Sequence, residues 1–101
     1  MIKSKLYDNT LYISLYGELD ENNAAKIRLE MENAIKNNKF QQIIIDLSEL
    51  SFMDSTGIGV LIGRYKLLKA QGVPVFISSP NNQVDKIFKM TGLYDIMPKI
   101  N

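Results

Sequence analysis

The fold is decided by residues 43–77, which read IIIDLSELSFMDSTGIGVLIGRYKLLKAQGVPVFI. This segment begins and ends with short apolar runs, residues 43–47 and 73–77, which are typical of central strands covered on both faces. Between the two runs the apolar residues recur at helical spacing up to about Gln71, and Gly72 suits the position after the end of a helix. A strand-helix-strand unit of this kind predicts two parallel strands joined by a right-handed crossover.

The residues before this unit predict a hairpin of two strands. Residues 11–16 carry aliphatic side chains at alternate positions, which indicates a strand with one buried face. Residues 3–7 are expected to pair with it through a turn at Asp8 and Asn9. Gly17 is expected to end the second strand.

Two further helices flank the central unit. The first is expected from about residue 21 to residue 38, where apolar side chains recur at helical spacing, with Asp20 as its N-cap. The other covers about residues 82–90, ends at Gly92 and leaves a tail, residues 93–100, with room for one more short strand. The order β-β-α-β-α-β-α-(β) predicts an α/β fold. We expect a single domain over residues 1–101, in which a mixed sheet of four or five strands packs against helices.

The composition argues against several classes of function. A net charge of +1 on 101 residues, without a run of basic residues, gives little support for nucleic-acid binding. The chain has no cysteine and no histidine, which removes thiol chemistry, the commonest metal ligand and the usual activator of a serine nucleophile. No signal peptide and no membrane-spanning apolar run are recognised. We therefore expect a cytoplasmic binding protein that is not an enzyme, with no cofactor, no metal and no membrane partner.

The central helix carries three glycines near its start, Gly57, Gly59 and Gly63. An interior glycine costs about 1 kcal/mol relative to alanine, so a structural reason is expected. On a helical wheel Gly59 and Gly63 lie opposite the apolar stripe, so we infer that the glycines do not serve close packing on the sheet. Val60 and Leu67 also lie away from that stripe. This small, partly apolar surface predicts a docking face for another protein, and the alternative is that the C-terminal tail covers it.

Asp54, Ser55 and Thr56 stand where the central helix begins. The ordinary role of such residues is to cap the helix, because a side-chain oxygen accepts a hydrogen bond from a free backbone N–H. Three of them followed by Gly57 also place an accessible hydroxyl on a turn with little steric cover. Free N–H groups and the positive end of the helix dipole would tolerate a phosphate there. We therefore predict phosphorylation of Ser55 or Thr56, beside the docking face.

Other interpretations of this region fit the residues less well. The glycine spacing departs by one residue from a dinucleotide-binding fingerprint, and Ser55 lacks both a histidine and a G-x-S-x-G context for hydrolysis. Glu18 and Asp20 near Asp54 suit capping or solvation better than a divalent cation. Weak nucleotide binding or hydrolysis stays an alternative function. A scaffold domain in a larger signalling assembly is another.

Residues 50–66, LSFMDSTGIGVLIGRYK, closely resemble the signature of the bacterial anti-sigma factor antagonists, which are single STAS domains. GELD at residues 17–20 and FKMTGLYDI at residues 88–96 resemble the family's flanking motifs in the same order, so the resemblance covers nearly the whole chain. SFMDS and GRYK are closer to the sporulation members, which act on anti-sigma F factors. Thr56 is equally expected in the general stress-response members. Members usually continue into a C-terminal helix, whereas this sequence ends at Asn101.

The resemblance implies a partner-switching role. The unmodified protein would bind an anti-sigma factor that is also a serine kinase, and so free the sigma factor. The kinase would then phosphorylate Ser55 with ATP and release the product, and a serine phosphatase would reset it. The resemblance also implies that Asp20 lies near Ser55 and contacts the kinase. The expected partner-binding residues are Asp20, Asp54, Thr56, Gly57, Gly59, Val60, Gly63 and Leu67.

Overall fold

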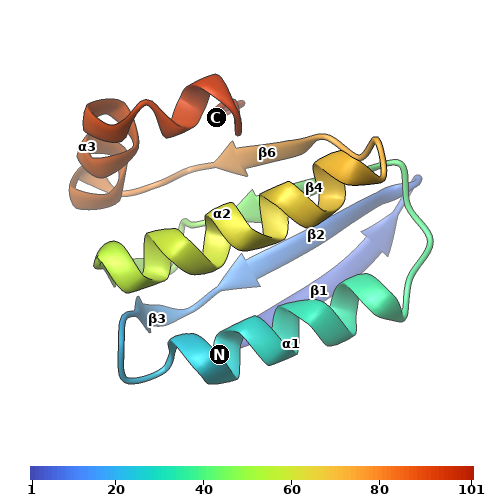
Figure 1. Ribbon diagram of the computed structural model, residues 1–101, viewed down its shortest axis with the longest axis horizontal. Coiled ribbons are helices and arrows are strands. Elements are labelled where there is room, and N and C mark those ends of the chain that lie inside the picture. Colours follow the sequence, from blue (N-terminus) through green and yellow to red (C-terminus); the bar gives the residue numbers. More distant parts are fainter.

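Four strands form the main sheet in the spatial order β1-β2-β4-β6. Their bounds are Ile2–Tyr7 for β1, Thr10–Leu15 for β2, Gln42–Asp46 for β4 and Val75–Ser78 for β6. β1 runs antiparallel to β2, whereas β2, β4 and β6 are parallel to one another. The computed structural model describes residues 1–101 and places helices α1 (Ala24–Lys36) and α2 (Ser55–Ala70) on the same face of this sheet (Figure 1). The predicted α/β fold with a mixed sheet is confirmed.

The turn of the β1–β2 hairpin consists of Asp8 and Asn9, as predicted. Both residues have positive φ angles, 51° and 64°. Asp and Asn tolerate this left-handed region better than other non-glycine residues, and two such residues in succession match the twist of a tight hairpin. The turn therefore fixes the register of β1 on β2.

Only one face of the main sheet is covered by helices. The inward side chains of β2 and β4, such as Ile13 and Ile45, are fully or almost fully buried, while their neighbours Tyr12 and Ile44 are half-buried. The expectation that residues 43–47 form a strand covered on both faces is therefore wrong. A run of consecutive isoleucines does not show by itself which of its two faces a helix will cover.

Helix α1 begins three residues later than the sequence suggests. The chain first makes a turn, in which the Asp20 carboxylate accepts the backbone N–H groups of Asn22 (2.9 Å) and Asn23 (3.3 Å). The helix starts at Ala24, and its N-cap is Asn23. Asp20 thus caps the turn ahead of the helix, and its assignment as the helix N-cap is corrected.

A second, small sheet was not predicted. It pairs β3 (Gly17–Leu19) with β5 (Leu50–Met53) in parallel. Gly17, expected to end a strand, begins this one, with a φ of +78° that favours glycine. Strands of three and four residues are too short to show a period of two, so the sequence gives no sign of them.

The C-terminal part of the chain packs on the main sheet and on β5. Helix α3 (Asn82–Thr91) ends at Gly92, whose φ of +73° is the left-handed conformation expected after a helix. A short 3-10 turn, η1 (Leu93–Asp95), follows. The tail then forms a single parallel bridge between Ile77 and Lys99 at the edge of β6. It adds no further strand, and it runs along β6 instead of crossing α2. None of the helices combines the length and the apolar character needed to cross a membrane.

Candidate functional site

Ser55 is the first residue of α2, and its side chain is exposed, as is that of Thr56. The preceding residue, Asp54, is extended and caps the helix: its Oδ1 accepts the backbone N–H of Gly57 at 3.0 Å. Ser55 and Thr56 are not needed for capping, because Asp54 performs it. Their hydroxyl groups stand at the positive end of the helix dipole, open to approach.

Asp54 also joins the start of α2 to the connection between β3 and α1. Its Oδ2 accepts the backbone N–H of Glu21 at 3.2 Å, and its own N–H donates to the Leu19 carbonyl at 3.3 Å. These bonds bring the turn that contains Asp20 alongside the residue that precedes Ser55. Asp20 is half-buried, and one of its carboxylate oxygens accepts hydrogen bonds within the turn.

Gly57 serves close packing, contrary to the inference drawn from the helical wheel. It is buried, and a Cβ atom at this position would lie 2.8 Å from Leu19 Cγ and 2.9 Å from Met53 Cγ. It would lie closer still to the carbonyl oxygen of Leu19. Only glycine lets the first turn of α2 rest on β3 and β5 at this distance. Gly57 therefore shapes the site from beneath and offers no surface to a partner.

Gly59 and Gly63 do not serve close packing, as predicted. A Cβ atom added at either position would meet no other atom within 4 Å, so this side of α2 is bare. Leu67, one turn further on, is 55% exposed. The tail does not cover these residues, which removes the alternative that another part of the chain roofs this surface. Ser55, Thr56, Gly59, Gly63 and Leu67 are together called the α2 flank below.

Val60 does not belong to the α2 flank. Its exposure is 8%, and it is part of the hydrophobic core. The reason is a second contact of α2. Arg64 lies four residues after Val60, on the same side of the helix. Its Nη1 atom is 3.3 Å from Oε1 of Glu32 in α1. Helix α1 thus covers the side that carries Val60. The prediction of Val60 as a docking residue is wrong.

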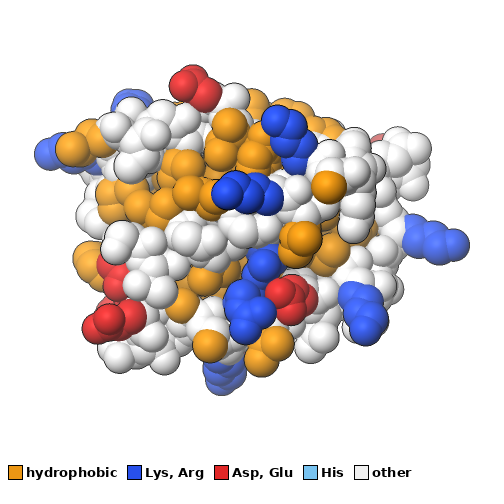
Figure 2. All heavy atoms as spheres, viewed as in Figure 1, with side chains coloured by type: hydrophobic (Ala, Val, Ile, Leu, Met, Phe, Trp, Pro, Cys, Tyr) orange, Lys and Arg blue, Asp and Glu red, His pale blue; other side chains and the backbone are white.

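Phe52 is a candidate contact residue that the sequence reasoning missed. It lies in β5, three residues before Ser55, and is 41% exposed. A large apolar side chain at this exposure, next to an accessible hydroxyl, suits a protein interface. Figure 2 shows hydrophobic side chains gathered between α2 and the segment formed by α3 and the tail.

Two amide side chains at the start of α3 hold β5 in place. Asn81 donates to the carbonyl oxygens of Leu50 (3.2 Å) and Ser51 (3.0 Å). Gln83 bonds both backbone groups of Met53, accepting from its N–H at 3.3 Å and donating to its carbonyl at 3.2 Å. Because Met53 leads directly into Asp54, these bonds position the start of α2. Nothing in the sequence marked either residue for this purpose.

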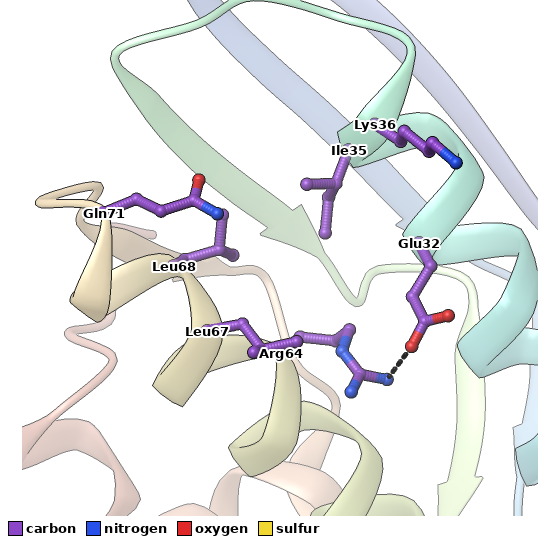
Figure 3. Close-up of a pocket in the computed structure, with 7 residues that line it drawn as sticks. All are labelled: Glu32, Ile35, Lys36, Arg64, Leu67, Leu68 and Gln71. Carbon is purple, nitrogen blue, oxygen red and sulfur yellow. Dashed lines mark ion pairs between the residues drawn. The ribbon is translucent and has the colours of Figure 1, made fainter.

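The largest hollow beside α2 lies on the α1 side, away from Ser55. It has a volume of about 450 Å³ and is lined by residues of α1 and α2, with Arg64 and Glu32 pointing toward each other at one end (Figure 3). Glu32 also pairs with Arg28 at 3.2 Å, so one carboxylate serves two guanidinium groups and ties the two helices together. Of the α2 flank, only Leu67 reaches this cavity.

The glycine-rich turn itself lines no cavity, and the four cavities of the molecule all lie elsewhere. A nucleotide would thus find no concave site there. Nor does the structure gather three acidic side chains in a geometry able to hold a metal ion, so Glu18, Asp20 and Asp54 do not form a cation site. Apart from Leu67, the α2 flank lines no cavity, which suits contact with another macromolecule better than binding of a small ligand.

Comparison with known proteins identifies the family of this chain. The STAS domain family matches residues 1–101. The chain is 36% identical over 97 residues to an anti-sigma F factor antagonist of Paenibacillus polymyxa, covering 96% of this chain and 83% of the relative. It is 30% identical over 93 residues to an anti-sigma-B factor antagonist of Bacillus subtilis, covering 92% of this chain and 84% of the relative.

Solved structures show the same relationship. The anti-sigma factor antagonist SpoIIAA in its unphosphorylated form superimposes with a TM-score of 0.81 at 31% identity, over 100% of this chain and 89% of that one. The Bacillus cell fate determinant SpoIIAA in its phosphorylated form gives 0.74 at 30% identity, over 100% and 92%. The full-length family match and these relatives show that the chain belongs to the STAS-domain family, alongside the anti-sigma factor antagonists.

Proposed function

We propose that this protein is an anti-sigma factor antagonist that is switched by phosphorylation of Ser55. In its unmodified form it binds an anti-sigma factor that is also a serine kinase, and this binding frees the sigma factor in the cytoplasm. Phosphorylation of Ser55 by the bound kinase ends the complex, and a serine phosphatase restores the binding form. The protein itself acts by binding and catalyses no reaction.

The observation that carries this proposal is the accessible hydroxyl of Ser55 beside the bare α2 flank. A partner surface that touches Gly59 and Gly63 meets backbone at close range, and the same surface necessarily approaches Ser55, because all three lie within the first turns of one helix. Relatives named as antagonists, and a relative solved both with and without its phosphate, support this assignment.

The charge of a phosphate explains how the contact would be lost. A phosphoserine carries about −1.5 to −2 charges at neutral pH. It would stand next to the Asp54 carboxylate and face the nucleotide phosphates of the kinase. Two like charges about 4 Å apart repel by about 4 kcal/mol at an effective dielectric of about 20. Since about 1.4 kcal/mol is a tenfold change in affinity, part of this repulsion suffices to weaken binding more than a hundredfold.

No change of fold is required for this switch. Asp54 already satisfies the Gly57 N–H and joins α2 to the neighbouring turn, so the helix start is held in place whether or not Ser55 is modified. The phosphate would add charge to a preformed surface. The expected difference between the two forms is therefore local and electrostatic.

The test uses two substitutions of Ser55 and one of Thr56. We expect Ser55→Asp to fold normally but to lose binding to the anti-sigma kinase, and Ser55→Ala to bind and to stay bound in the presence of ATP. Thr56→Ala, the neighbouring control, is expected to bind and to be released by ATP like the natural sequence. Native mass spectrometry of each mixture reports both the complex and the added phosphate. A phosphate gained by Ser55→Ala but absent from Thr56→Ala would move the site to Thr56.

The sporulation pathway is the proposed setting, with the general stress response as the alternative. The identity to the anti-sigma F factor antagonist, 36%, exceeds the 30% to the anti-sigma-B factor antagonist. The same experiment, run in parallel with an anti-sigma F factor and an anti-sigma-B factor, separates the two: ATP-dependent release from the second alone would assign the protein to the stress response.

A further inference from the structure

Strand β1 forms an outer edge of the main sheet, and half of its backbone groups point away from the sheet. The Tyr16 N–H donates to the Met1 carbonyl at 3.0 Å, and β1 continues in the same register along β2. Hydrogen-bonded pairs alternate along an antiparallel ladder, so Lys3 and Lys5 direct their backbone groups toward β2. The backbone groups of the residues between and beside them face outward.

Those outward groups belong to Ile2, Ser4 and Leu6. The first is occupied, because the Ile2 N–H donates to Glu30 Oε1 of α1 at 3.1 Å. Ser4 and Leu6 are exposed, and no strand lies beyond them, since β1 is the last strand in the sheet order. An N–H and a C=O at each of these two residues are therefore open to a further strand.

Hollows on both sides of β1 leave room for the side chains of such a strand. On the helix side, a groove of about 510 Å³ between β1 and α1 is lined by Ser4 and by polar side chains that include Asn33 and Asn37. On the uncovered face of the sheet, a hollow of about 470 Å³ is lined by Lys3, Lys5 and tyrosines. An added strand would place alternate side chains into these two spaces.

The two charged side chains that line the hollow on the uncovered face, Lys3 and Lys5, are both basic. Lys3 Nζ lies 5.4 Å from the centre of the Tyr16 ring, and Lys5 Nζ lies 5.8 Å from the centre of the Tyr7 ring. These cation–π contacts hold both ammonium groups over the face, at alternate positions of the edge strand. No ion pair engages either lysine, since the four ion pairs of the chain lie elsewhere.

We propose that the β1 edge binds an extended acidic segment of a partner protein as an additional strand. Backbone hydrogen bonds to Ser4 and Leu6 would align the segment. Acidic side chains at alternate positions would face Lys3 and Lys5, and the intervening residues, polar or small, would enter the groove beside Asn33. This surface shares no residue with the α2 flank, so the interaction is a second one, independent of the switch at Ser55.

A second copy of this chain is a poor occupant of the same edge. Antiparallel pairing of two β1 strands about Ser4 would set Lys3 of one copy opposite Lys5 of the other, and like charges opposite each other are destabilising. Lysines on an edge strand commonly prevent self-pairing in this way. The same charges favour a partner of opposite sign.

The test is an NMR titration of the full chain with designed peptides of about ten residues, long enough to exceed an average strand. One peptide alternates Glu with Thr, and its matched control alternates Lys with Thr. We expect the acidic peptide to shift the amide signals of Ser4 and Leu6 and to slow their hydrogen exchange, and the basic peptide to do neither. Methylating the peptide nitrogens at one set of alternate residues is expected to abolish binding, and at the other set to leave it intact, because only one set faces β1.

Charge reversal supplies the second arm. In the double variant Lys3→Glu, Lys5→Glu we expect the acidic peptide to bind about tenfold more weakly and the basic peptide to bind instead. The expected size of the change follows from the reversal of two cross-strand charge pairs. Ser55→Asp is expected to leave peptide binding unchanged, which separates this test from that of the proposed function. The proposal would be overturned if both peptides bound equally or if the position of methylation made no difference. It would also be overturned if an oligonucleotide bound better than the acidic peptide, or if the protein formed a concentration-dependent dimer through β1.

Discussion

Glycines in two different environments lie within a few residues of each other in α2, and only the structure shows the difference between them. Gly57 is pressed against Leu19 and Met53, whereas Gly59 and Gly63 face open space. The sequence predicted the second kind from the helical wheel, because that argument needs only the direction of a side chain. It missed the first, because the contact is made with β3 and β5, which were themselves not predicted.

This contrast gives a matched pair of substitutions. Gly57→Ala is expected to lower the free energy of unfolding by about 1–3 kcal/mol, since the new methyl group must displace Leu19 or the first turn of α2. Gly59→Ala is expected to raise it by about 1 kcal/mol, since alanine favours the helix and meets nothing. Urea denaturation followed by circular dichroism measures both. Equal effects of the two substitutions would contradict the packing described for Gly57.

At the scale of elements, the central strand-helix-strand unit, the hairpin and α3 were predictable because each carries a clear period or turn signal. The errors come from contacts between elements. A helical wheel puts Val60 on an open face because it assumes one buried side, while α2 packs on both the sheet and α1. The sequence places the start of α1 too early because Asp20 can cap either a helix or a turn, and only the backbone shows that it caps a turn.

The link between α3 and β5 leads to a prediction about Asn81. Its side chain accepts the Val84 N–H at 2.9 Å as the N-cap of α3, and donates to the carbonyls of Leu50 and Ser51. Asn81→Ala is expected to destabilise the protein by about 1–2 kcal/mol, the range for loss of a helix cap. The neighbouring Asn82→Ala is the control, because Asn82 is exposed and caps nothing.

The measurement is thermal or urea unfolding of both variants, with binding to the proposed anti-sigma kinase as a second readout. Asn81 also fixes β5, and β5 leads into the start of α2. We therefore expect weaker kinase binding in Asn81→Ala even at temperatures where the variant is fully folded. Stability loss without any loss of binding would show that β5 keeps its position without this side chain.

At the scale of the whole molecule, the polar cluster that fastens the C-terminal tail makes stability depend on pH. Asp85 of α3 accepts hydrogen bonds from the Tyr94 hydroxyl (2.5 Å) and the Lys99 ammonium (3.0 Å), and pairs with Lys89 (3.0 Å). The bond from Tyr94, followed by those from Lys89 and Lys99, holds the pKa of Asp85 well below its ordinary value. Burial, helped by Asp85, raises the pKa of Tyr94 above its ordinary value.

The sign of the effect follows from the lowered pKa of Asp85. The ionised carboxylate favours the folded state, so its contribution is complete above the ordinary Asp value of about 4 and is lost as the pH falls below it. We expect Asp85→Asn to lower the melting temperature at neutral pH, and the difference from the natural sequence to shrink on acidification. For Tyr94 the contribution is complete below about pH 10 and is lost above it. Asp95→Asn, on an exposed residue nearby, is the control. A difference for Asp85→Asn that stays constant with pH would contradict this account.

The order of strands and helices along the chain was its most predictable property. The uncovered outer face of the sheet was its least predictable property. Alternation in β2 indicated one buried face correctly, but the isoleucine run of β4 suggested two. Which face a helix covers depends on the handedness and length of connections, and these leave no local pattern in the residues. The tail was likewise expected to have room for a strand, and it makes only one bridge to β6.

The open backbone at Gly59 and Gly63 has a consequence for anyone who engineers this protein. A selection for heat resistance would replace both glycines with alanine, because each methyl group strengthens the helix and touches nothing inside the molecule. The selected variants would be more stable and would keep the fold, but we expect them to bind the proposed partner more weakly, because each added methyl group stands between the partner surface and the helix backbone. A selection on stability alone would count these variants as improved, and the expected loss would appear only when binding is measured.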